Sequence, residues 1–489
     1  MKFSTKNLHL RAGGGLVVVM HKQDAECIGA HAMDRIELSS GSKKAIAILD
    51  IAEGPSTVRP GYVGLFEEVA EELRAKDKVD VQLAEKPKSV AFIMKKLEGQ
   101  ALSFHEFKEI IKDIVDNRLS LIELTTFVLA NYTAGLSERE VLELTKAMIE
   151  TGHRLRLPGK VADFHSIGGV PGNRTTPIVV SIVAATGVWF PKTSSRAITS
   201  PAGTADTMEV VCKVDLSFEQ LQKVVRKTKG CLVWGGAVQL APADDRIIRI
   251  ENPLNIDAEG QMLASIMAKK ASVGATHLLL EIPVGKGAKA SRHEATHLQQ
   301  HFGTLAKHLG IQLKVAVTDG SQPIGNGIGC RLEMRDILRV LRNQDNAPKD
   351  LRDKSLVMAG HLLEMLGKAK KGEGTCLAEE ILTSGRALKK FDQMVRAQGG
   401  KLPRTIFLCD NKQTIKATRS GSVRSIDNQV IARIAKIAGA PLDACSGVDL
   451  HVHRGDKITK GQPLLTIYAM SKDKMKYALA VYKNGVEVR

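Results

Sequence analysis

The amino-acid sequence predicts a mixed α/β protein with four parts, the largest of them built on a mostly parallel β-sheet. From about residue 160 to 410, short apolar runs alternate with helical segments, the pattern of strand–helix–strand units. Before this region the apolar spacing changes from period two to period 3.6, so a β-rich module precedes a helical domain. Short strands and turns return after about residue 420.

Residues 1–86 are predicted to form the N-terminal β-rich module. Alternating runs at 16–20, 35–39 and 44–49 are separated by turns that contain glycine. One helix, at 65–73, interrupts the strands.

Residues 87–158 are predicted to form a small helical domain, with a second contribution from about 245–275. Apolar side chains three and four residues apart mark one helix face, and three helix starts carry a serine followed three residues later by glutamate. These capping boxes are Ser103/Glu106, Ser120/Glu123 and Ser137/Glu140. Nothing in this domain suggests catalysis.

Residues 159–415 are predicted to form the α/β domain, and 416–489 an α+β module that resembles a barrel-sandwich. The clearest strands of the α/β domain are at 188–190, 277–284, 315–318 and 406–409. Polar loops with glycine follow the strands, where ligands bind in sheets of this class. The segment 455–471 resembles the hairpin of a biotinyl or lipoyl carrier, but Ser471 stands at the position of the modified lysine, which excludes a carrier function.

Composition and cysteine usage favour a soluble, cytoplasmic protein. The chain is 43% hydrophobic and 25% charged, without an apolar run of membrane-spanning length or the apolar core of a signal peptide at its start. The seven cysteines are odd in number, scattered and never paired as C-x-x-C, which argues against a disulfide framework and a zinc site. We expect them to fill the core.

The formal net charge of +17 predicts an anionic partner: nucleic acid, an anionic membrane surface or a phosphorylated small molecule. Only 4% of residues are aromatic, so the stacking platforms of single-strand binders would be hard to build. Charge alone does not choose among these partners, and the basic residues are dispersed, as on an ordinary solvated surface. No membrane and no specific nucleic acid are expected as partners.

The stretch 163–176 (DFHSIGGVPGNRTT) predicts a phosphate-binding loop. It follows a strand end at 161–162 and precedes an apolar helix at 175–186, so its amides and the helix N-terminus would face an anion. A second loop, 192–207 (KTSSRAITSPAGTADT), offers five hydroxyls before its helix start, and also a guanidinium. Such a loop can also simply cap its own backbone, but two of them after successive strands favour a ligand site.

Two further segments could contribute. Ser265 and Lys269 are four residues apart on one predicted helix face, and could contact one ligand together. The turn at 285–289 (GKGAK) follows a buried strand and carries two lysines. Taken singly, the first feature is better explained by an ordinary surface lysine beside a capping serine, and the alternative for the second is an ordinary strand-to-helix turn.

Together the motifs DFHSIGGVPGN, KTSSRAITSPAGTADTME, VWGGAVQLAPADD, ASIMAKK and PVGKGAK resemble the thymidine/pyrimidine-nucleoside phosphorylase family. The resemblance covers essentially the whole chain and is closest to the branch that contains archaeal AMP phosphorylases, which shares the extra N-terminal module. It implies reversible phosphorolysis: inorganic phosphate, a co-substrate, attacks C1′ of a nucleoside and the base leaves. No metal and no organic cofactor are implied. It also implies a homodimer or higher homo-oligomer with the subunit contact in the helical domain.

For the nucleoside enzymes, the resemblance assigns phosphate binding to five positions: Ser166, Gly168, Gly169, Ser194 and Thr204. Ser265 and Lys269 match positions that hold the pyrimidine, where Lys269 would stabilise charge on the leaving base. His165 would hydrogen-bond or protonate that base.

The AMP-type comparison gives an overlapping assignment for a nucleotide. Its contacts are Gly169, Ser195, Arg196, Ala197, Ile198, Thr199, Ser200, Thr204, Ser265 and Lys289. Asp257 would be the proton donor, although an aspartate that opens a helix is also a common N-cap. Lys289 and Arg196 could neutralise the second phosphate, which a nucleoside lacks.

One residue departs from the family motif. The phosphate loop of the nucleoside enzymes reads Asp-Lys-His-Ser, with the lysine on phosphate, but this chain has Phe164 there. We expect another cation, Arg174, Lys192 or Lys289, to replace that contact, or activity to be altered.

The sequence therefore favours a phosphorylase of thymidine or a related pyrimidine nucleoside. A nucleoside 5′-monophosphate phosphorylase is the close alternative, and a non-catalytic phosphate- or RNA-binding protein a more distant one. Anthranilate phosphoribosyltransferase, which resembles this family in architecture, ranks lower because no acidic pair is clearly placed for its magnesium.

Overall fold

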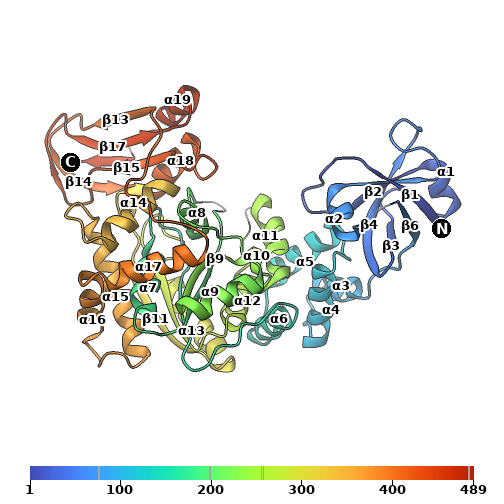
Figure 1. The fold of residues 1–489 in the computed structure, drawn as a ribbon, viewed down its shortest axis with the longest axis horizontal. Helices are drawn as coiled ribbons and strands as arrows, with labels where there is room; N and C mark the ends of the chain where they lie inside the picture. Colours follow the sequence, from blue (N-terminus) through green and yellow to red (C-terminus); the bar gives the residue numbers. More distant parts are fainter. Residues whose placement is uncertain (75–76, 198–199, 255, 257, 483–484) are drawn as a thin grey trace. The chain divides into compact units, whose positions relative to one another are not determined.

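The computed structural model describes residues 1–489 except 75–76, 198–199, 255, 257 and 483–484 (Figure 1). The chain divides into two compact units. The first holds residues 1–151 and 242–265, and the second holds 152–241 and 266–489.

The first unit begins with a closed six-stranded barrel of order β1-β5-β2-β4-β3-β6 (blue in Figure 1). Its strands are β1 Lys2–Asn7, β2 Val17–His21, β3 Arg35–Ser40, β4 Lys43–Ala52, β5 Tyr62–Leu65 and β6 Lys78–Leu83, with the short helices α1 Lys22–Cys27 and α2 Glu67–Leu73. Inward-facing apolar residues such as Val18, Met20 and Ile36 are fully buried. The predicted β-rich module is confirmed, and closure leaves no sheet edge.

The rest of the first unit is helical. Its helices are α3 Ser89–Leu97, α4 Phe104–Val115, α5 Leu121–Ala134, α6 Glu138–Glu150, α11 Pro242–Leu254 and the first half of α12 Glu259–Ser272. All three predicted capping boxes are present, at the starts of α4, α5 and α6. Each satisfies two backbone amides that the helix itself leaves unpaired.

The second unit is built on a parallel sheet of two hydrogen-bonded parts, β11-β10-β7 and β8-β9, joined by a parallel bridge between Val161 and Trp189. The strands are β7 Ala162–Ser166, β8 Phe190–Ser194, β9 Gly230–Trp234, β10 His277–Val284 and β11 Gln312–Asp319. The predicted α/β class is confirmed. Because all five strands are parallel, the loops that follow them lie at one edge of the sheet.

Helices cover this sheet (Figure 1). They are α7 Thr175–Ala184, α8 Thr204–Glu209, α9 Phe218–Thr228, α10 Gly235–Val238, α13 Arg292–His308, α14 Cys330–Leu341, α15 Lys349–Met365, α16 Gly374–Thr383 and α17 Arg386–Ala397. Every residue of α7 is buried, and α7 packs against α15 and α17 at the centre of the largest core.

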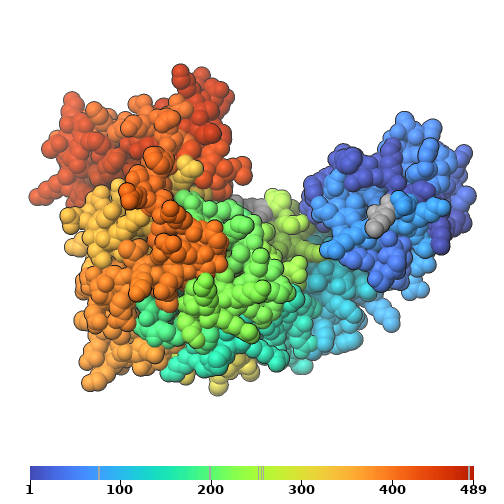
Figure 2. Space-filling model, viewed as in Figure 1, coloured from blue at the N-terminus to red at the C-terminus, as the bar shows by residue number. Residues whose placement is uncertain are grey.

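The end of the chain, in red in Figure 2, forms an α+β module that belongs to the second unit. One antiparallel sheet has the order β12-β15-β17-β13 and another the order β16-β14-β18. The elements are β12 Gly327–Ile328, β13 Lys412–Lys416, β14 Gly421–Ile426, β15 Gly447–Leu450, β16 Lys457–Ile458, β17 Pro463–Tyr468, β18 Val486–Val488, α18 Asn428–Ala438 and α19 Lys472–Val481. Ser471 caps α19 by accepting a hydrogen bond from the Lys474 amide at 3.2 Å.

Three sequence expectations are wrong. The strand predicted to end at 161–162 continues to Ser166, so the first four residues of the DFHS motif are strand. Residues 406–409 form no strand, and Phe407 is 76% exposed. Not all cysteines fill the core: Cys27 and Cys376 are exposed, and Cys409 is joined to Cys445 in a disulfide.

The disulfide can be tested by counting the free thiols of the protein. Without reductant, the unfolded protein should show five thiols to a thiol reagent, and seven after reduction. In the folded protein only Cys27 and Cys376 should react quickly, because Cys212, Cys231 and Cys330 are buried; burial raises the pKa of Cys212 to about 12. Seven thiols without reductant would show that the protein as purified has no disulfide.

No helix in the described part of the chain has both the length and the apolar character needed to span a membrane.

Candidate active site

Strand β7 presents two polar side chains on one face and an apolar one on the other. Side chains alternate along a strand, so Asp163 and His165 share a face while Phe164 points the opposite way. Phe164 is fully buried in the core around α7. The alternation of β7 therefore aims His165 and a charged partner at the same side of the sheet.

Asp163 is the centre of a buried charge cluster. Its Oδ1 lies 3.3 Å from the Lys192 ammonium on β8, and its Oδ2 lies 2.9 Å from the Lys270 ammonium on α12. None of the three side chains is more than 5% exposed. Desolvation lowers the pKa of Lys270, an effect that Asp163 opposes and Lys192 adds to. One carboxylate thus holds two cations beside His165.

The environment of His165 disfavours the protonated imidazole. Burial, and then repulsion from four ammonium groups, hold its pKa well below the ordinary value of 6.5. The four groups belong to Lys270, Lys192, Lys269 and Lys289. Asp163 pairs with two of these lysines, Lys192 and Lys270.

This shift predicts a pH-dependent stability. In the unfolded chain His165 takes up a proton near pH 6.5, whereas the folded protein resists it. Its contribution is complete above about pH 6.5 and is lost as the pH falls from there towards the folded pKa, by at most about 1.4 kcal/mol per pH unit. Denaturant unfolding of the wild type and His165→Asn between pH 7.5 and 5 measures it. As the pH falls, the unfolding free energy of the wild type should decrease more than that of His165→Asn. If the two free energies changed in parallel with pH, a lowered pKa of His165 would be contradicted.

The glycine turn after β7 packs against the segment that carries Lys289. Gly168 and Gly169 have φ of +87° and +88°, which favours glycine. A Cβ on Gly169 would lie 2.5 Å from the backbone nitrogen of Lys289, whereas one on Gly168 would meet no atom within 4 Å. The turn therefore brings Lys289 to the predicted phosphate loop and leaves open space beside Gly168. The Gly168 amide donates a long hydrogen bond, 3.5 Å, to the Ser166 hydroxyl.

Glu281 on β10 holds this turn in place through hydrogen bonds. Its fully buried carboxylate accepts hydrogen bonds from Asn173 Nδ2 at 3.2 Å and Thr318 Oγ1 at 2.7 Å, and it pairs with Lys354 of α15. The Ile167 amide donates to the Glu281 carbonyl at 3.1 Å. Charge-assisted bonds of this kind fix the geometry of the loop that β7 feeds into.

The second predicted loop is folded onto the start of α8. The Asp206 carboxylate accepts hydrogen bonds from the amides of Ala197 at 2.6 Å and Gly203 at 2.9 Å, and the Ser195 carbonyl accepts from the Ala205 amide at 3.3 Å. Ser200 donates to the Ala202 carbonyl at 2.9 Å, and Thr204 is the first residue of α8. The backbone-capping alternative is therefore partly realised.

The Ser194 hydroxyl, at the end of β8, donates to the Val233 carbonyl at 3.3 Å. It would have to turn to donate to phosphate.

Arg196 does not face an open site. Its guanidinium pairs with Asp206 at 3.2 Å, Glu209 at 2.6 Å and Asp215 at 3.0 Å, and it lies over the Trp234 ring. These partners raise its pKa, Glu209 contributing most. The expectation that Arg196 neutralises a second phosphate is not favoured, because three carboxylates already compete for it.

Three cations, Arg174, Lys192 and Lys289, are expected to replace the phosphate contact of the family lysine. Arg174 pairs with Glu333 at 2.5 Å and bonds to Thr207 and the Ala202 carbonyl, and Lys192 pairs with Asp163. Lys289 is the candidate that the glycine turn contacts directly. Phe164 itself is fully buried in the core around α7.

Three predicted residues, Asp257, Ile198 and Thr199, lie outside the described residues. Ser265 belongs to the first unit, one helical turn before Lys269 on α12. The other predicted residues lie in the second unit and come from the loops at the carboxyl edge of the sheet or from α12. A pocket of about 500 Å³ at the ends of β10 and β11, lined by Gly285 and Arg292 among others, includes none of them.

Sequence reasoning missed Asp163, Lys270 and Glu281 as parts of the site. Asp163 opens the DFHS motif and Lys270 ends ASIMAKK, so both stand beside residues that were singled out. A buried acid next to a strand-end histidine and a second lysine were the available signals.

Family models identify the class of protein. The helical bundle domain of the glycosyl transferase family matches residues 90–152 and the a/b domain of that family matches 158–388. The pyrimidine nucleoside phosphorylase C-terminal domain matches 422–489. The chain is therefore a glycosyl transferase of the pentosyl-transferring kind.

Similar sequences narrow the class. A protein named "Putative thymidine phosphorylase" from Legionella pneumophila subsp. pneumophila is 42% identical over 489 residues, 99% of this chain and 94% of that protein. One of the same name from a Polaromonas species is 44% identical over 469 residues, 95% of this chain and 91% of that protein. The chain belongs to the thymidine/pyrimidine-nucleoside phosphorylase family.

Solved structures show the fold. Anthranilate phosphoribosyltransferase from Thermus thermophilus has a TM-score of 0.53 at 19% identity, covering 63% of this chain and 99% of that one. The enzyme from Saccharomyces cerevisiae gives 0.52 at 16% identity, covering 64% and 99%. At these identities the likeness concerns the fold alone.

Proposed function

We propose that this enzyme phosphorolyses thymidine or a related pyrimidine nucleoside to the free base and a (deoxy)ribose 1-phosphate. The observation that carries the proposal is the neutral His165 in the field of four lysines, beside a glycine turn at the carboxyl edge of the sheet. The names of the most similar relatives support the nucleoside. Inorganic phosphate is the co-substrate, and no metal or organic cofactor takes part.

In the reaction a phosphate oxygen forms a bond to C1′ as the bond from C1′ to the base nitrogen breaks. The electron pair of the broken bond stays on the base, which leaves as an anion and gains a proton. The enzyme must hold a dianion and a sugar carbon in line and stabilise charge on the departing base. The four lysines whose charges act on His165 are cations of the kind that both tasks need.

The proposed roles follow from position. Ser166, Ser194 and Thr204 with the Gly168 and Gly169 amides would bind phosphate, the Gly168 side facing open space. Lys269 would stabilise the negative base and His165 would hydrogen-bond it. Because its pKa is lowered, His165 would donate its single N–H as a neutral imidazole.

A nucleoside 5′-monophosphate is the second candidate, giving ribose 1,5-bisphosphate. Lys289 favours it, because its backbone packs against Gly169 and its charge acts on His165. Arg196 gives it no support, since its carboxylate partners already neutralise it.

A homodimer in the cytoplasm accompanies the proposal. Helix α5 exposes Leu121 at 70% and Ile122 at 66%, apolar side chains that a subunit contact would cover.

A base-release assay tests the function. The purified protein is incubated with phosphate and thymidine, uridine, cytidine, AMP, CMP or UMP, and free base is measured. We expect thymidine or uridine turnover that depends on phosphate, and His165→Ala and Lys269→Ala to lower it by about 100-fold or more. Turnover of nucleotides alone would support the second candidate. No base release together with steeply salt-dependent RNA affinity would support a non-catalytic nucleic-acid binder instead.

A further inference from the structure

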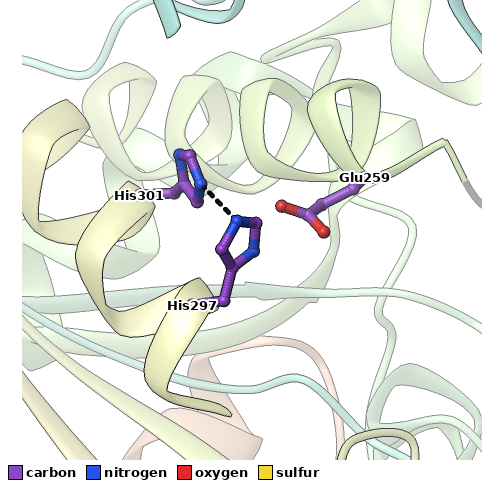
Figure 3. A group of neighbouring side chains, drawn as sticks. All are labelled: Glu259, His297 and His301. Atoms are coloured by element: carbon purple, nitrogen blue, oxygen red, sulfur yellow. Dashed lines mark hydrogen bonds between the residues drawn. The ribbon is translucent and has the colours of Figure 1, made fainter. Parts of the chain in front are cut away.

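Helix α13 carries two histidines whose rings meet edge to face on its surface (Figure 3). His297 and His301 are four residues apart, so they lie on one side of the helix. Their Nε2 atoms are 3.0 Å apart and their ring centroids 4.3 Å apart. Glu259, also drawn in Figure 3, belongs to the first unit and takes no part in the argument.

The distance between the two Nε2 atoms fits a shared metal ion. Metal–imidazole bonds are about 2.0–2.1 Å long, so two of them would place the nitrogens about 3 Å apart at the right angle of an octahedral or square-planar ion and about 3.4 Å apart at the tetrahedral angle of zinc. The observed separation of 3.0 Å is close to this range, and the rings would turn so that both Nε2 lone pairs point at the ion. A helical HxxxH spacing is also the one that zinc-binding helices use.

The alternative is that the two rings merely share a proton. In that state one Nε2 carries hydrogen and donates to the other, so only one lone pair remains. A metal ion replaces this proton when both rings carry their hydrogen on Nδ1. Protons and metal compete for the same lone pairs, so binding must weaken as the pH falls.

We propose that His297 and His301 form a binding site for a divalent transition-metal ion on α13. Imidazole nitrogen selects zinc, nickel, copper and cobalt over magnesium and calcium, which prefer oxygen. The two imidazoles supply two of the ligands of the ion. The ion clamps two successive turns of the helix, so binding stabilises the folded chain and raises its Tm. The site lies outside the residues assigned to catalysis, and it is independent of the proposed function.

Isothermal titration of the full chain with Ni²⁺ at pH 7.5 tests the site. His297→Ala and His301→Ala should each weaken the tightest binding at least tenfold and abolish the Ni²⁺-dependent rise in Tm, while Mg²⁺ should bind to none of the proteins. Both positions are at least partly solvent-exposed and alanine favours helix, so the variants should fold.

His293→Ala is the matched control, because His293 is exposed on the same helix four residues before His297. It should leave Ni²⁺ affinity and the Tm shift unchanged. If His293→Ala weakened binding as much as His301→Ala, the site would be assigned to the wrong pair. If the wild type bound Ni²⁺ no more tightly than His297→Ala, the pair would share a proton only and the proposal would be overturned.

Discussion

Replacing Gly169 with alanine is expected to lower kcat/KM for phosphate-dependent base release on the order of 100-fold, the effect of misplacing a binding group by about 1 Å. The added Cβ would lie 2.5 Å from the backbone nitrogen of Lys289 and 2.9 Å from the Cβ of that residue. Backbone cannot yield as a flexible side chain can, so the glycine turn and the Lys289 segment must move apart. The glycine amides proposed to bind phosphate and a lysine whose charge acts on His165 would then shift together.

Gly187→Ala separates this effect from backbone strain. Gly187 has nearly the same φ, +83° against +88°, but an added Cβ there meets no atom within 4 Å. Both variants therefore carry the cost of a left-handed alanine, about 1–2 kcal/mol, and only Gly169→Ala carries the collision. Steady-state kinetics at varied phosphate, with circular dichroism to confirm folding, compares them. Equal losses of kcat/KM in the two variants would mean that the approach to Lys289 is unimportant for activity.

Elements that depend on residues close together in the sequence could be predicted from the sequence. The three capping boxes and the buried strand at 277–284 depend on residues close in sequence, and they stand where expected. The apolar run at 406–409 looked equally strand-like, yet Phe407 is exposed there. What decides such a segment is whether a neighbouring strand exists to pair with it, which no local pattern contains.

The site was harder because its charges pair over long distances in sequence. Phe164 looked like a lost phosphate contact because the motif was treated as a loop; as strand, its alternation sends that side chain into the core. Arg196 looked available for a ligand because its partners are 10, 13 and 19 residues away. Sequence can say which cations exist near a motif, but only packing shows which of them are already neutralised.

Asp163→Asn is the second large effect, and it tests whether the lysines around His165 depend on one buried acid. Removing the carboxylate charge leaves Lys192 and Lys270 as buried cations, 5% and 3% exposed, which is expected to cost about 3–5 kcal/mol of unfolding free energy. This would be a large share of the roughly 5–15 kcal/mol that holds a domain folded. Part of the cost should be avoided at high pH, because Lys270, with its lowered pKa, can lose its proton.

Two comparisons make the interpretation of Asp163→Asn specific. Asp392→Asn breaks an exposed i,i+4 pair with Arg396, at 2.6 Å, and should cost less than about 1 kcal/mol. The double variant Asp163→Asn/Lys270→Met also removes one of the two buried cations that paired with Asp163, so it should recover part of the unfolding free energy lost in Asp163→Asn. Urea unfolding of the four proteins at pH 7 measures the differences. If Asp163→Asn cost no more than Asp392→Asn, the buried cluster would not hold the lysines in place, and the charge that makes His165 neutral would need another source.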